Sequence, residues 1–108
     1  LDIGSNSIGQ KGTYAIAGSL SQLTTLNIQE NNMAEGTETI ADNLRQLTTL
    51  NIENNSVGEK GAEAIAGNLM QLTTLKISWN SIGEKAAHAI ADNLKQLTML
   101  DIRGNMIG

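Results

Sequence analysis

The stretch LNIENNSVGEKGAEAIAGNLMQLTT, residues 50–74, recurs with small changes along the rest of the chain. Residues 1–25 read LDIGSNSIGQKGTYAIAGSLSQLTT, and residues 75–99 read LKISWNSIGEKAAHAIADNLKQLTM. Residues 26–49 form a copy that is one residue shorter, and residues 100–108 begin a further copy. The copies therefore repeat every 24 or 25 residues. A period of about 20 to 29 residues predicts a solenoid of stacked units.

We expect one domain over residues 1–108, because each unit of a solenoid packs only on its neighbours. Four full copies exceed the three or so units that such an array needs for stability. The chain begins without Met inside one copy and ends inside another. We therefore expect it to be a fragment of a longer array.

Each copy opens with a short segment in which aliphatic and polar residues alternate. Leu50 and Ile52, for example, alternate with Asn51 and Glu53. A period of two predicts a strand with one buried face. One such strand in each stacked copy predicts a parallel sheet, with the polar residues on its solvent side.

The second half of each copy has the spacing of a helix. Ala62, Ile65 and Leu69 are three and four residues apart. This spacing predicts a helix of about three turns whose aliphatic stripe faces the sheet. The pairs Gly-Asn at residues 67–68 and Asp-Asn at residues 92–93 lie where we expect these helices to end.

The frame L-x-x-L-x-L-x-x-N-x-L occurs at residues 23–33, 47–57, 72–82 and 97–107, and in truncated form from Leu1. This frame resembles that of leucine-rich repeat proteins over essentially the whole chain. The resemblance implies an α/β fold, a right-handed horseshoe-shaped solenoid with a parallel sheet on its concave face and helices on its convex face. The following pattern, I-G-x-K-G-A-x-A-I-A, resembles the ribonuclease-inhibitor-like subclass, and the short period is most similar to GALA-type repeats of bacterial effectors.

One Asn follows every strand at the point where the chain turns. Its amide can both donate to and accept from backbone groups, which would otherwise be buried without partners. We interpret these residues as a structural ladder rather than as ligand contacts. They are Asn6, Asn31, Asn55, Asn80 and Asn105.

The second copy departs from the pattern in its loop. Residues 33–36 lack one residue and also the Gly that stands at positions 9, 58 and 83. The loop either follows a different path or binds something, or it carries a simple deletion in an exposed segment, which loops tolerate well.

The solvent side of the sheet varies most from copy to copy. Adjacent strands lie about 4.8 Å apart, so the exposed residues form rows across the sheet. An exposed Trp beside mixed charges has the composition of an interaction hot spot. The alternative is that Lys76 and Asp101 neutralise each other and that Trp79 packs over the strand end. We predict a partner-binding patch made of Glu53, Lys76, Ser78, Trp79, Met99, Asp101 and Arg103.

The composition argues against several partners. Seven basic and eleven acidic residues give a net charge of −4, the wrong sign for nucleic acid. No apolar run is long enough to span a membrane. The chain has no Cys, so no disulfide or thiolate metal site can form. The lack of Cys favours a reducing compartment, the cytoplasm or, for a delivered protein, a host cytoplasm.

No residue pattern indicates catalysis or a cofactor. His88 is the only His, and its counterparts in the other copies, Tyr14, Glu38 and Glu63, lie on the outward helix face, so we predict that it is a solvated surface residue. The phosphate-binding and nucleophile-elbow motifs are absent from the sequence. We predict no catalytic, cofactor or metal residues.

Three functions fit these observations. The first is a non-enzymatic scaffold that binds a protein partner through the concave face, as the resemblance implies. The second is the substrate-recognition arm of a larger effector or ubiquitin-ligase-type protein, whose catalytic or adaptor domain lies outside this chain. The third is a self-assembling module that stacks end to end through uncapped apolar edges, at Leu1 and Ile3 on one side and Leu100 and Ile102 on the other.

Overall fold

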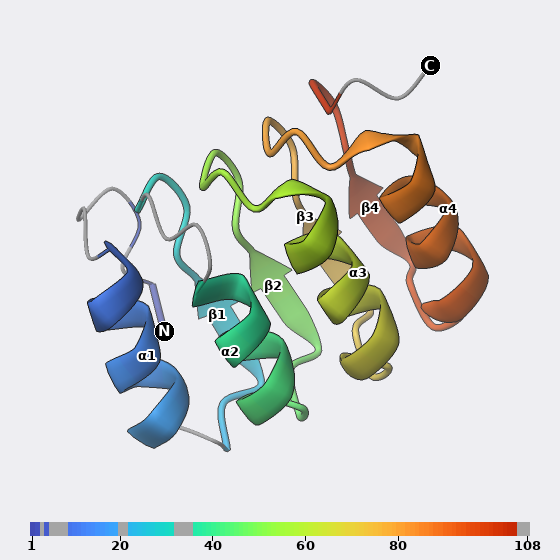
Figure 1. Ribbon diagram of the computed structural model, residues 1–108. Coiled ribbons are helices and arrows are strands. Elements are labelled where there is room, and N and C mark those ends of the chain that lie inside the picture. Colours follow the sequence, from blue (N-terminus) through green and yellow to red (C-terminus); the bar gives the residue numbers. More distant parts are fainter. Residues whose placement is uncertain (3, 5–8, 20–21, 32–35, 106–108) are drawn as a thin grey trace.

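A computed structural model describes the whole chain except residues 3, 5–8, 20–21, 32–35 and 106–108. Helices and strands alternate along it (Figure 1). In chain order the elements are α1 Gly9–Ser19, β1 Thr25–Asn27, α2 Gly36–Asn43, β2 Thr49–Asn51, α3 Gly58–Asn68, β3 Thr74–Lys76, α4 Gly83–Asn93 and β4 Met99–Asp101.

The four strands form one parallel sheet in the order β1-β2-β3-β4. Their register follows the repeat, so that Leu26 pairs with Leu50, Leu50 with Leu75 and Leu75 with Leu100. The helices lie in a second layer that covers one face of this sheet (Figure 1). The predicted repeat architecture of parallel strands alternating with helices is therefore confirmed.

The core lies between these two layers. Leu50, Ile52, Ile65 and Leu69 are fully buried, and the equivalent positions of the neighbouring copies are buried in the same way. Each aliphatic residue is covered by its counterpart one copy away, because the strands share one register. Burial is incomplete at the last strand, where Leu100 is 39% exposed.

Small residues set how closely the helices approach. A Cβ atom added at Gly61 would lie 2.7 Å from Val57 Cγ1 and 3.2 Å from Thr37 Cβ. At Gly36 the same atom would lie 2.7 Å from the methyl group of Thr13. Because these distances are shorter than ordinary van der Waals contact, glycine at these two positions allows neighbouring helices to pack side by side.

The helices α3 and α4 end where the sequence predicts, and each begins at a glycine. Gly58 and Gly83 open them with φ angles of +72° and +79°, which glycine adopts without steric cost. The helices end at Asn68 and Asn93, the expected positions. The described part of α2 has eight residues, against eleven in each of the other helices. Most of the variant loop, residues 33–35, lies outside the described residues.

Candidate interaction face

The buried Asn residues connect each copy to the next. Asn55 Nδ2 donates to the carbonyl oxygens of Ile28, Ile52 and Glu53 at 2.9 to 3.0 Å. Its Oδ1 accepts from the backbone N–H of Asn31 at 2.8 Å. The Asn80 and Asn105 side chains repeat this pattern one copy further on. Asn31, Asn55, Asn80 and Asn105 are at most 2% exposed, whereas Asn6 lies outside the described residues.

The residue before each of these Asn forms the lip of the sheet. Glu30, Asn54, Trp79 and Gly104 all have left-handed backbones, with φ between +55° and +69°. The N–H groups of the first three donate to a carbonyl of the next copy at 2.9 to 3.0 Å. Asn and Gly suit this conformation, whereas a Trp side chain is disfavoured there by about 1 kcal/mol. The backbone of Trp79 is therefore held in the left-handed conformation by its hydrogen bond to the next copy, and not by the conformational preference of Trp.

Trp79 combines exposure with a fixed position. Its side chain is 64% exposed, and one part of the indole ring lies against the backbone of Gly104. A Cβ atom at Gly104 would come within 2.3 Å of the ring, so only glycine leaves room for it there. The interpretation of Trp79 as packing over the strand end thus describes part of the ring, while most of it faces solvent.

Asp101 and Arg103 form a bidentate ion pair on the last strand and its turn. Arg103 Nε and Nη2 donate to the two carboxylate oxygens at 2.9 and 2.8 Å. This hydrogen bond lowers the pKa of Asp101, and the nearby charge of Lys76 adds a smaller lowering. The alternative pairing of Lys76 with Asp101 is not the one observed. Asp101 ends β4 and Arg103 lies two residues later in the turn, a spacing that permits this pairing without specifying it.

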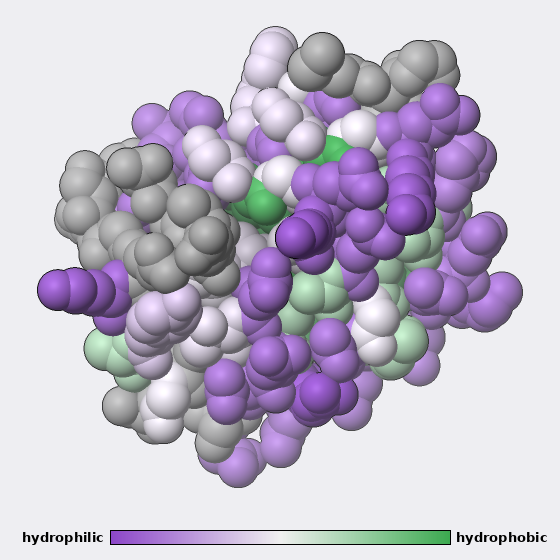
Figure 2. All heavy atoms as spheres, viewed as in Figure 1, coloured by the Kyte–Doolittle hydropathy of each residue, from purple (hydrophilic) through white to green (hydrophobic). Residues whose placement is uncertain are grey.

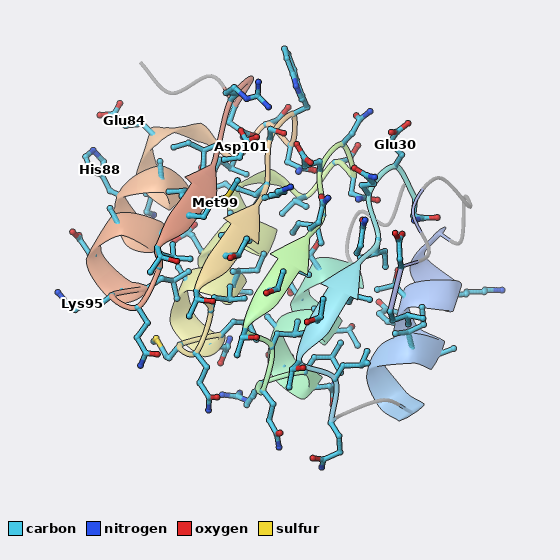
Figure 3. All side chains as sticks on the ribbon, turned by 180° about the vertical axis from the view of Figure 1, so that it is seen from behind. Glu30, Glu84, His88, Lys95, Met99 and Asp101 are labelled. Atoms are coloured by element: carbon cyan, nitrogen blue, oxygen red, sulfur yellow. The ribbon has the colours of Figure 1, made fainter. Side chains whose placement is uncertain are left out.

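Ser78 does not lie on the exposed surface where the sequence analysis placed it. It is fully buried, and its hydroxyl donates a hydrogen bond to the Glu53 carboxylate. A partner therefore meets the Glu53 side chain at this point of the row rather than Ser78. Met99 is 40% exposed on the last strand, and Figure 3 shows it with Asp101 on the side of the sheet away from the helices.

We call the sheet surface that is turned away from the helices the concave face. A shallow hollow of about 360 Å³ lies on it. Its centre is formed by two parallel rows, a threonine row and a row of amides that ends in a lysine. The lining residues are Leu1, Asp2, Thr25, Leu26, Asn27, Thr49, Leu50, Asn51, Thr74 and Lys76.

The helix face has a different character. Hydrophilic residues cover most of it over α3 and α4 (Figure 2). Lys85 Nζ lies 4.0 Å from Glu59 Oε1, and His88 Nε2 lies 3.5 Å from Glu84 Oε1. The side chains of both pairs are more than half exposed, as expected for a solvated surface (Figure 3).

A larger hollow of about 580 Å³ lies on the helix face, lined mainly by α2 and the start of α3. Glu38, Asp42 and Glu59 contribute carboxylates to it, beside Lys60. Residues 32–35, which precede α2, lie outside the described residues, and we assign no role to this hollow.

Within the described residues, no group of three or more His, Asp or Glu side chains is placed to hold a metal ion. None of the described helices combines the length and apolar character needed to cross a bilayer.

Comparison with known families gives a match over more than half of the chain. The model of the family described as leucine rich repeat aligns with residues 45–107. A comparison with curated proteins gives no match. The matched segment contains the strands β2, β3 and β4, the helices α3 and α4, and every residue of the predicted partner-binding patch.

Proposed function

This chain belongs to the leucine-rich repeat family, and we propose that it is a non-enzymatic scaffold that binds a protein partner through the concave face. Domains of this family generally mediate protein–protein interaction and are typically not catalytic. Exposed Trp79 carries the assignment to this face. The left-handed backbone of Trp79 lowers the stability of the fold. Because most of its ring is exposed, burial of the ring offsets little of this loss. The presence of Trp at this position therefore points to a role outside folding.

The geometry supports a rigid contact surface. The Asp101–Arg103 pair and the bond from Ser78 to Glu53 hold three of the charged side chains in place. The ladder of buried Asn residues holds the backbone beneath them. A surface that is already ordered loses little conformational entropy on binding, so its contacts contribute more fully to affinity.

Affinity capture with matched variants tests this proposal. The wild-type chain and a Trp79→Ala, Lys76→Ala double variant serve as baits for the same protein extract. We expect the double variant to lose partners that the wild type retains, because it lacks the exposed aromatic anchor and a cation of the concave face. A Met70→Ala, Lys95→Ala variant is the control, since both of its residues are exposed in turns between helix and strand. Equal recovery of every partner by all three baits would remove the concave face as the site.

A finer family placement belongs to the same proposal. We infer the ribonuclease-inhibitor-like subclass, and within it the GALA-type repeats, from the short period and the I-G-x-K-G-A-x-A-I-A pattern. The α-helical convex layer supports this placement, because leucine-rich repeats can carry either a helix or a 3₁₀ segment there. Profiles built from each subclass provide the test, and a better score for another subclass would reassign the chain.

The same surface could serve as the recognition arm of a larger effector or ubiquitin-ligase-type protein. The complete reading frame decides this point. A frame that contains repeats alone would exclude a catalytic or adaptor domain on the same chain.

End-to-end stacking is a second candidate function for this chain. Leu1 and Leu100, which lie on opposite edges of the sheet, are 46% and 39% exposed. Unpaired strand edges with apolar residues favour association with a second copy. Light scattering over a concentration series would show growing oligomers, and a strict monomer at high concentration would exclude this function.

A further inference from the structure

The hollow on the concave face is lined by amide and hydroxyl groups that can donate hydrogen bonds. Asn27 Oδ1 accepts from the backbone N–H of Gln29 at 3.3 Å, and Asn51 Oδ1 accepts from that of Glu53 at 3.1 Å. These bonds engage both amide oxygens through the backbone of the same copy. Asn51 Nδ2 has only a long contact of 3.4 Å, to Gln29 Oε1.

The carboxylates on or beside the hollow are held by groups of the protein itself. Asp2 Oδ1 accepts from the backbone N–H of Gly4 at 3.2 Å. Glu53 accepts from the Ser78 hydroxyl, and Asp101 accepts two bonds from Arg103. Each of these carboxylates therefore has at least one oxygen engaged by the protein before any ligand arrives.

Lys76 differs from these carboxylates. Its partners in the sheet register are Asn51 and Asp101, and Arg103 already occupies both oxygens of Asp101. Within the described residues, the Lys76 ammonium has no ion pair or hydrogen bond. The side chain is only half-exposed and lines the hollow beside the Thr74 and Thr49 side chains. A cation among neutral donors favours an anionic acceptor.

We propose that the hollow binds an acidic, extended segment of the partner protein, with an Asp or Glu carboxylate against Lys76 and main-chain carbonyls against the Asn27 and Asn51 amides. This inference rests on the proposed function and names the chemistry of the partner. A carboxylate fits better than a phosphate. A doubly charged phosphate favours bidentate Arg, and Arg103 is already paired with Asp101.

Selection of displayed random peptides on the immobilised chain tests the proposal. Peptides enriched on the wild type should contain Asp or Glu well above their frequency in the library. Their affinity should fall about tenfold in Lys76→Gln, the loss expected for one charged hydrogen bond. Lys76→Arg should retain binding, because it keeps the charge, and Lys76→Glu should select basic peptides instead. Lys95→Gln is the matched control and should bind as the wild type does, because Lys95 lies in an exposed turn outside the hollow (Figure 3).

Salt and a blocking variant separate the possible outcomes. Affinity for the acidic peptides should weaken with added salt in the wild type and much less in Lys76→Gln, since screening acts on the charge pair. Thr49→Tyr fills the hollow without changing its charge and should abolish binding. Circular dichroism of each variant shows that the fold is intact.

Three results would overturn the inference, and they separate it from the proposed function. Peptides that Thr49→Tyr blocks but that show no acidic excess would leave the concave face as the site with different chemistry. A failure to enrich peptides, while a Trp79→Ala single variant loses captured partners that Lys76→Gln retains, would place the partner on the lip rather than in the hollow. A failure of both experiments would remove the proposed function as well.

Discussion

Trp79 and Asn80 are neighbours in the chain, yet Trp79 belongs to the exposed lip of the sheet and Asn80 to the buried Asn ladder, and the two regions are constrained differently. Asn80 is 1% exposed and makes its hydrogen bonds to two adjacent copies. Trp79 is 64% exposed, and its counterparts are Glu30, Asn54 and Gly104. The ladder must be the same in every copy because each Asn side chain bonds backbone groups of its own copy and of the copy before it. Residues of the concave face and its lip differ from copy to copy, and the contacts between copies there are individual pairs, such as Ser78 with Glu53 and Trp79 with Gly104.

The largest effect is expected in the ladder. Asn55→Ala removes at least three donated bonds and one accepted bond, and leaves buried backbone groups of two copies without these partners. We expect a loss of about 3 kcal/mol in the free energy of unfolding. Urea denaturation provides the measurement. Asn54→Gly is the adjacent control and should change stability little, because Asn54 is exposed and its φ of +57° suits glycine. An unchanged midpoint for Asn55→Ala would refute the structural role of the ladder.

A smaller effect is expected where the two regions meet. Gly104→Ala places a methyl group within 2.3 Å of the Trp79 ring and strains a backbone with φ of +69°. We expect a loss of about 1 to 2 kcal/mol and a red shift of the fluorescence of the chain's single Trp, as the ring moves into water.

Gly67→Ala is the matched control for that change. Gly67 lies in α3 with no atom within 4 Å of an added Cβ, so alanine should stabilise the helix by up to about 1 kcal/mol. An unshifted emission spectrum in Gly104→Ala would show that the ring is not held against the glycine in solution.

The smallest effect is expected on the concave face itself. The pKa of Asp101 is lowered in the folded chain, chiefly by the hydrogen bond from Arg103. The pair therefore contributes stability at pH values above the unfolded pKa of about 4, and this contribution is lost as the pH falls through the lower folded value. The thermal midpoint of Arg103→Gln should then fall less steeply than that of the wild type when the pH is lowered below about 4. Parallel pH profiles for the two chains would contradict the pair in solution.

Much of the fold could be predicted from the residues. The period of 24 or 25 specified the copies, and the spacing of Ala62, Ile65 and Leu69 specified which helix face is buried. The Gly-Asn pair at residues 67–68 and the Asp-Asn pair at residues 92–93 marked the ends of α3 and α4. These features are local or strictly repeated, so one copy carries the information for all of them.

The candidate site was harder to predict. The exposed side chains near Lys76 could be listed from the alternation of the strand, but not their pairing. Ser78 is buried, and its hydroxyl donates a hydrogen bond to the Glu53 side chain of the adjacent copy. The pairing of Asp101 with Arg103 rather than with Lys76 depends on side-chain geometry within one extended segment. Such choices involve rotamers and distances that a pattern of residue types does not contain.

By itself, the sequence determined that this chain is a stack of strand and helix units that share one register. The reason is that a repeated pattern of aliphatic side chains can be buried only against a neighbouring unit with the same pattern. Only the tertiary structure decided which polar groups of the concave face remain free. The Asn27 and Asn51 oxygens turn toward the backbone, and Arg103 occupies both oxygens of Asp101. The Lys76 ammonium is therefore left near Asp101 without a hydrogen bond or close ion pair in the described part of the chain. Hydrogen bonding is directional and exclusive, so the free groups are known only once the positions of the bonded ones are known.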